Sequence, residues 1–269
     1  AAMEAMWETE PAPASFTAFG VPSMSDRTTR FAVRIPWVMG LIGTRSIDKE
    51  IPGIFELVQR AEGRIRNGLT AYDALEKLKV NHGDAVARAS FDATSKDLGY
   101  ALLLKRYIDD PRQANDDQIK QAAWSTVPEV PAIFFTFRMM VLCAFLLLAV
   151  FAISLWHTMR ETPAPRWLLC IALIAMPLPW LAAELGWFVS EFGRQPWIIE
   201  GTLPTFLATS ELGIPDLLIT ILGFTLVYGV LAVIEVKLML QAIAKGPAVG
   251  ADIAPPFGEG TQVHLAAAR

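Results

Sequence analysis

The sequence is poor in the side chains that most often bind metals or form disulfides. Of its 269 residues, two are cysteines and three are histidines. Cys143 and Cys170 have no CxxC spacing, so neither a zinc site nor a disulfide framework is expected, and both are interpreted as small buried apolar residues. His82, His157 and His264 all lie outside the long apolar runs, so no histidine is expected in the middle of a membrane segment.

The sequence also has no excess of basic residues, since it contains 23 Lys and Arg and 27 Asp and Glu. A near-neutral balance excludes nucleic acid as the expected partner. The charges are distributed unevenly: residues 1–128 hold 16 Lys/Arg and 17 Asp/Glu, whereas residues 129–269 hold only 7 and 10. This division predicts a polar domain followed by a membrane domain.

Three uncharged apolar runs occur in the second part, namely Met139–Trp156, Trp167–Ala183 and Leu217–Ile234. A transmembrane helix needs about 20 mainly apolar residues. We therefore expect an all-α integral membrane protein, with three transmembrane helices and an N-terminal, mainly helical extramembrane loop domain. The expected parts are a domain over 1–128, transmembrane helices over 129–157, 166–191 and 216–245, a loop over 192–215 and a tail over 246–269.

The extramembrane domain shows helical periodicity from Ile54 onward, with apolar residues three or four positions apart. A second helix is expected over 84–107. A third is expected to begin at Asn115, because Gln118 stands three residues later, as in a capping box. The alternating segment 31–35 leaves two possibilities open, a short strand or a segment lying on the membrane surface.

The short loops predict an orientation. Five Lys or Arg lie in the first connector and beyond the third apolar run, whereas the loop over 191–215 carries only Arg194. Positive charge favours the cytoplasmic side, so the first connector and the C-terminus are expected there, with residues 1–128 on the outer side. Because the chain does not begin with Met and shows no signal peptide, it is expected to be part of a longer protein.

Ionisable side chains inside or beside the apolar runs are candidates for function, because their burial in a membrane is costly. They are Arg138, Glu184, Glu191 and Glu235. For Arg138 and Glu235, snorkelling to the interface is the structural alternative. Glu184 and Glu191 are seven positions apart, so on a helix they face nearly the same way. Burial raises carboxylate pKa values, which suits proton transfer, and Glu184 is the candidate for that role.

Met140 stands two residues after Arg138 in the motif "FRMM". A methionine in a membrane helix usually serves packing, but its thioether can also bind a haem iron. Without a histidine at mid-membrane, any haem here would take a Met or a carboxylate from this chain and its remaining ligands from elsewhere.

Seven motifs, in their order along the chain, carry a family resemblance. They are "EAMWETEPAPASFTAFG", "TRSIDKEIPG", "RIRNG", "DLGYALLLKRY", "FRMM", "PLPWLAAELGWFVSEFGRQPW" and "LPT". Together they resemble the C-terminal half of subunit I of the cytochrome bd quinol oxidases, in the form with a long quinol loop. The resemblance implies a respiratory enzyme of the bacterial inner membrane that oxidises quinol at its periplasmic loop. Electrons would pass through b-type haems to haem d, where oxygen is reduced to water, and a proton gradient would form without pumping.

The resemblance also implies site residues. Met140 matches the axial ligand of the low-spin haem b, and Arg138 matches the arginine beside that haem. Glu191 matches an axial ligand in the pair of high-spin haems, one of b type and one of d type. Trp187 matches a tryptophan lying among the haems, and Arg194 matches an arginine near haem propionates.

Glu4 matches a loop glutamate implicated in quinol oxidation. The implied partners are the missing N-terminal half of subunit I, which carries the histidine ligands, subunit II, small single-span subunits and membrane lipid. Two other classes remain open at this stage. A membrane transporter could carry buried Glu and Arg without haem, and a structural or assembly subunit could merely hold a haem protein.

Overall fold

The computed structural model describes residues 1–246 except positions 47 and 161. These residues belong to two compact units, which divide between Thr209 and Ser210. Of the tail expected over 246–269, only Gly246 is described, so His264 and Arg269 lie outside the described residues.

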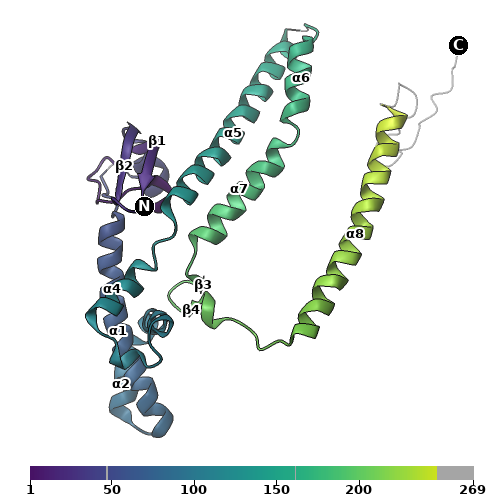
Figure 1. Ribbon diagram of the computed structural model, residues 1–269. Helices are drawn as coiled ribbons and strands as arrows, with labels where there is room; N and C mark the ends of the chain where they lie inside the picture. The colour runs from purple at the N-terminus through teal and green to yellow at the C-terminus, as the bar shows by residue number, and fades with distance from the viewer. Residues whose placement is uncertain (47, 161, 247–269) are drawn as a thin grey trace, which may run out of the picture. The chain divides into compact units, whose positions relative to one another are not determined.

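The first unit contains seven α-helices and four strands within the described residues (Figure 1). The helices are α1 (Ile54–Val80), α2 (Ala85–Thr94), α3 (Leu98–Leu102), α4 (Asp116–Trp124), α5 (Val130–Met159), α6 (Arg166–Ala175) and α7 (Leu178–Gly193). The strands are β1 (Phe16–Ser23), β2 (Thr28–Ile35), β3 (Trp197–Ile199) and β4 (Leu203–Pro204). Short helical turns are η1 (Ala2–Glu4), η2 (Gly40–Thr44), η3 (Ser95–Asp97), η4 (Leu103–Arg106), η5 (Pro111–Gln113) and η6 (Thr205–Leu207).

Three helical segments are long and apolar enough to cross a membrane: Val130–Met159, Arg166–Gly193 and Ile214–Lys245. The last is α8 (Ile214–Lys245), the helix of the second unit. The second segment is interrupted between α6 and α7, where Pro177 and Pro179 lack the N–H group that a continuous helix needs. The predicted fold class and its three membrane-length helices are thus confirmed. The break between α6 and α7 was not predicted.

The extramembrane domain is mainly helical, as expected. At the start of α4, Asn115 Oδ1 accepts from Gln118 N at 2.8 Å, and Gln118 Oε1 accepts from Asn115 N at 2.9 Å, which confirms the predicted capping box. The single helix predicted over 84–107 is wrong, because the chain forms α2, η3, α3 and η4 there. This interruption places the Asp97 carboxylate against Arg64 of α1, a tertiary contact that local periodicity does not encode.

The alternating segment 31–35 belongs to a strand. β1 and β2 form an antiparallel hairpin in which Phe16 lies opposite Ile35 and Val21 opposite Arg30. The apolar side chains of β2 point outward, since Phe31 is 82% exposed and Val33 57%. The hairpin therefore presents an apolar surface that the described residues leave uncovered.

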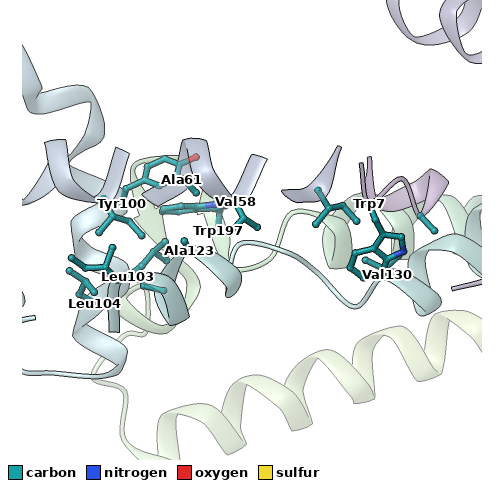
Figure 2. Packing of buried hydrophobic residues seen from close by; sticks show 14 of the residues in the cluster. Trp7, Val58, Ala61, Tyr100, Leu103, Leu104, Ala123, Val130 and Trp197 are labelled. Atoms are coloured by element: carbon teal, nitrogen blue, oxygen red, sulfur yellow. The ribbon is translucent and has the colours of Figure 1, made fainter. Parts of the chain in front are cut away.

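A hydrophobic core joins the parts of the first unit (Figure 2). It contains Trp7 from the N-terminal segment, Val58 and Ile65 from α1, Val130 from the first turn of α5, and Trp197 from β3. The extramembrane domain is therefore attached both to the start of α5 and to the segment that follows α7.

Two glycines of α1 provide a test of this packing. A Cβ at Gly68 would lie 2.2 Å from the Asp97 carbonyl oxygen, whereas a Cβ at Gly63 meets nothing within 4 Å. We expect Gly68→Ala to lower the free energy of unfolding by about 1–3 kcal/mol through overpacking. Gly63→Ala should raise it by up to about 1 kcal/mol through helix propensity. Thermal unfolding of the complete protein checks this, and equal effects of the two changes would contradict it.

Candidate functional site

A buried ion pair joins the N-terminal segment to the first membrane helix. Arg138 Nη2 of α5 lies 3.3 Å from Glu4 Oε2 of η1, and the two side chains are only 13% and 3% exposed. Glu4 also accepts a hydrogen bond from Thr17 N of β1 at 3.0 Å. The structure thus brings together two of the predicted site residues that are 134 positions apart in the chain.

All five N–H groups of Arg138 have partners within the first unit. Nε donates to the carbonyl of Ala18 at 3.2 Å. Nη1 donates to the carbonyls of Met3, at 2.8 Å, and Phe134, at 3.0 Å. Nη2 donates to Glu4 and to the carbonyl of Thr17. Arg138 therefore fastens η1 and β1 to α5, and its guanidinium also lies 3.3 Å from the centroid of the Phe134 ring.

Burial raises the pKa of the Glu4 carboxyl above its ordinary value. The positive charge of Arg138 and the hydrogen bond from Thr17 N oppose this effect, but the loss of solvent is the larger cause. Glu4 is thus a carboxyl group with an enhanced affinity for a proton.

A cavity of about 610 Å³ lies next along the chain; its lining begins at Ala5, the residue after Glu4, and includes neither Glu4 nor Arg138. Its lining comes from the segment that follows Glu4 and from the hairpin: Ala5, Met6, Trp7, Glu8, Thr9, Glu10, Pro11, Ala12, Pro13, Arg27, Thr28, Thr29 and Arg34. Trp7 Nε1 is buried and has no hydrogen-bond partner among the described residues. The volume lies in the range of small-molecule pockets, about 300–1,000 Å³.

Met140 lies between α5 and α7, on the side of α5 that faces away from Arg138. A Cβ at Gly186 of α7 would stand 3.2 Å from Met140 Sδ, and one at Gly193 would stand 3.5 Å from Ile133 Cδ1. The pairs Met140–Gly186 and Ile133–Gly193 align the two helices in antiparallel directions (Figure 1). The Met140 thioether therefore packs against the backbone of α7 at a position where a glycine leaves room for it.

The other predicted residues of α7 form a separate group. Arg194 Nη2 lies 3.0 Å from Glu191 Oε1, with both side chains 44% exposed. Successive helical residues are about 100° apart, so Glu184 points about 200° away from Gly186. Trp187, which is 64% exposed, and Glu191 follow on the same side as Glu184. This face of α7 is turned away from α5 and is left uncovered by the described residues of the first unit.

The described residues contain no group of three or more His, Cys, Asp or Glu that could hold a metal ion. His157 lies in the last turn of α5, and Glu235 lies in α8, the helix of the second unit. Sequence reasoning missed one polar cluster, in which Arg64 Nε donates to Asp97 Oδ1 at 2.7 Å and Arg64 Nη1 donates to the Tyr100 hydroxyl at 3.0 Å. The residues of this cluster belong to the motifs "RIRNG" and "DLGY", but the spacing of these motifs in the sequence did not indicate that they meet.

Glu4→Gln tests the buried pair. Removal of one partner leaves the Arg138 charge buried and uncompensated, which is expected to lower the free energy of unfolding by about 3–5 kcal/mol. The matched control is Glu8→Gln, four positions later, where the side chain is exposed and has no ion pair within the described residues. Thermal unfolding of the complete protein measures both, and a Glu4→Gln protein as stable as the control would contradict the assignment.

The chain was compared with known proteins. The family model described as "Cytochrome bd terminal oxidase subunit I" matches residues 1–247. Cytochrome bd-II ubiquinol oxidase subunit 1 of Escherichia coli (strain K12) is 37% identical over 248 residues, which are 92% of this chain and 48% of that protein. In Bacillus subtilis (strain 168), cytochrome bd ubiquinol oxidase subunit 1 is 31% identical over 45% of this chain and 26% of its own length.

A putative cytochrome bd menaquinol oxidase subunit I of Bacillus subtilis (strain 168) is 34% identical over 33% of this chain and 20% of its own length. The chain thus spans about half the length of the Escherichia coli relative. Since the family model covers the whole described region, the chain belongs to the cytochrome bd terminal oxidase subunit I family.

Proposed function

We propose that this chain is the quinol-oxidising and haem-binding C-terminal half of subunit I in a bacterial respiratory quinol:oxygen oxidoreductase. The observation that carries the proposal is the buried contact between Glu4 and Arg138. It joins the extramembrane segment that matches the quinol loop to the helix that carries Met140, two residues beyond Arg138. The relatives are named as oxidases of ubiquinol and of menaquinol, so we propose a quinol as the substrate class.

Glu4 is the proposed acceptor for a proton that quinol releases when it is oxidised. Burial raises its pKa, so the carboxylate binds a proton more readily than an exposed glutamate does. The neighbouring cavity, which Trp7 and Glu8 help to line, would hold the quinol ring. Arg138 holds Glu4 in place and stabilises its charged form before the proton arrives.

Met140 is the proposed ligand of the low-spin haem b, because it stands in the motif "FRMM" at the position that matches the ligating methionine of the family. A thioether ligand raises the potential of a haem iron, and the haems supply one-electron transfer and oxygen reduction when bound. Arg138 would act on this haem through its charge, since its five N–H groups already have protein partners.

The uncovered face of α7 is the proposed contact surface for the pair of high-spin haems, b and d. Glu191 would offer its carboxylate to one of the haem irons, Arg194, which pairs with that carboxylate, would lie near the propionates, and Trp187 would lie among the haems. The N-terminal half of subunit I, with the histidine ligands, would complete this site. Subunit II, small single-span subunits and membrane lipid are the further proposed partners.

The orientation follows from the loop charges. Residues 1–128 and the 192–215 loop would lie in the periplasm, and the C-terminus would lie in the cytoplasm. Quinol protons would then be released outside while protons for water come from the cytoplasm. The result is a proton gradient without a pump.

Met140→Leu tests the haem assignment in the complete oxidase. We expect the reduced-minus-oxidised optical spectrum to lose or convert the low-spin haem b band selectively, because leucine has no sulfur to bind iron. Met139→Leu is the matched control, since Met139 is the neighbouring residue and is 49% exposed. An unchanged low-spin band in Met140→Leu would refute the ligand. A spectrum without haem bands in the unsubstituted complex would refute the oxidase and favour a transporter.

Glu184→Gln tests the proposed proton-transfer role in the same complex. Loss of the titratable group is expected to lower quinol-driven oxygen consumption by about tenfold or more, while the haem bands remain. Glu211→Gln, at an exposed loop position, should leave the rate unchanged. Unchanged oxygen consumption in Glu184→Gln would end this assignment.

A further inference from the structure

Three motifs that are distant in sequence meet at one polar cluster of the first unit. We call it the Arg64 cluster and define it as Arg64, Asp97, Tyr100 and Trp197. Arg64 donates to Asp97 Oδ1 at 2.7 Å and to the Tyr100 hydroxyl at 3.0 Å. The guanidinium also lies over the Tyr100 ring, 4.1 Å from its centroid. The Tyr100 ring also contacts the Trp197 ring, with centroids 4.9 Å apart (Figure 2).

Three of the four members of the Arg64 cluster are shielded from solvent: Asp97 is 6% exposed in its side chain, and Tyr100 and Trp197 are 7% and 5% exposed. The Arg64 side chain is 41% exposed, and its Nε and Nη1 groups are bonded to Asp97 and Tyr100. The cluster is therefore a specific connection between the extramembrane helices α1 and α3 and the segment after α7.

Glycines allow the backbones to approach closely around this connection. A Cβ at Gly99 of α3 would stand 2.2 Å from the Gly201 carbonyl oxygen, in the turn between β3 and β4. Gly201 itself has φ +69° and contacts both Tyr100 and Arg64. Any larger residue at Gly99 would push the turn away, so the two segments interlock through their backbones as well as through the side chains.

The segment that the Arg64 cluster holds is bonded in turn to the end of α7. Trp197 N donates to the Arg194 carbonyl at 3.1 Å, and Thr205 N donates to the Pro196 carbonyl at 2.8 Å. Thr205 Oγ1 also donates to Gln195 Oε1 at 2.9 Å. Arg194, three residues before Trp197, forms the ion pair with Glu191. A continuous series of contacts therefore runs from Arg64 to the Glu191 carboxylate: hydrogen bonds and one ion pair, with the aromatic contact between Tyr100 and Trp197 as one link.

We propose that Arg64 and Tyr100 are positioning residues for Glu191. They fix Trp197 and the segment 194–197 against the extramembrane domain, and that segment fixes Arg194 beside the Glu191 carboxylate. The inference rests on the proposed function, in which Glu191 binds a high-spin haem. It assigns a second role to the extramembrane domain. Besides binding quinol, the domain would hold Glu191, the proposed haem-binding residue of α7, in position.

Arg64→Gln in the complete oxidase is the test, with Arg66→Gln as the matched control. Arg66 stands two residues later on α1 and pairs with Asp116 at 2.8 Å, but their side chains are 53% and 73% exposed. The first measurement is backbone amide exchange over 194–205, where the amides of Trp197 and Thr205 report the held segment. We expect exchange to be about tenfold faster in Arg64→Gln, through easier local opening, and unchanged in Arg66→Gln.

The second measurement is the reduced-minus-oxidised spectrum of the same preparations. Arg64→Gln should weaken the high-spin haem signal relative to the low-spin haem b band, and Tyr100→Phe, which keeps the ring against Trp197, should weaken it less. Equal loss of both signals would reduce Arg64 to a general structural role and overturn the proposal. Unchanged amide exchange or an unchanged high-spin haem signal in Arg64→Gln would also overturn the proposal.

The two proposals fail in different ways. If the unsubstituted complex has no haem bands, the proposed function fails, and with it the role of Glu191 as a haem ligand. Amide exchange does not depend on haem. Unchanged exchange in Arg64→Gln, in a complex that does show the haem bands, would therefore overturn only the positioning role.

Discussion

The arrangement of the first unit depends on the burial of one charge pair, Glu4 with Arg138. A buried guanidinium is stable only when its charge is balanced and its N–H groups are bonded. In this protein the requirement is met by one carboxylate and four backbone carbonyls, which come from η1, β1 and α5. The N-terminal segment must therefore lie against the N-terminal part of α5, and this fixes where the hairpin and the cavity that begins at Ala5 are formed.

Helix α7 has two sides that differ in their surroundings. Its glycine side admits Met140 and Ile133 of α5, because Gly186 and Gly193 have no side chains. Its opposite side carries Glu184, Trp187 and Glu191, which the described residues of the first unit leave uncovered. A carboxylate and a large aromatic ring in the apolar part of a membrane need a partner. The proposed haems and the N-terminal half of subunit I fit that need.

Much of the architecture was predictable from the sequence. Long uncharged runs indicated the membrane helices, because their length matches a bilayer, and Asn115 with Gln118 marked the start of α4, because a capping box is a local interaction. The break at Pro177 and the interruption between α2 and α3 were not predicted. The first depends on how two prolines act within an apolar run, and the second depends on a contact between Asp97 and Arg64, which stand 33 positions apart.

The sequence by itself determined the fold class, the candidate residues and, through its motifs, the family resemblance. Only the tertiary structure decided which candidates meet. Glu4 contacts Arg138 across 134 positions, Met140 lies against Gly186, and Arg64 reaches Tyr100 and through it Trp197. Periodicity and motif spacing describe neighbours along one helix or turn. Pairing between distant segments depends on which buried charges and close backbone approaches are satisfied together when the whole unit folds.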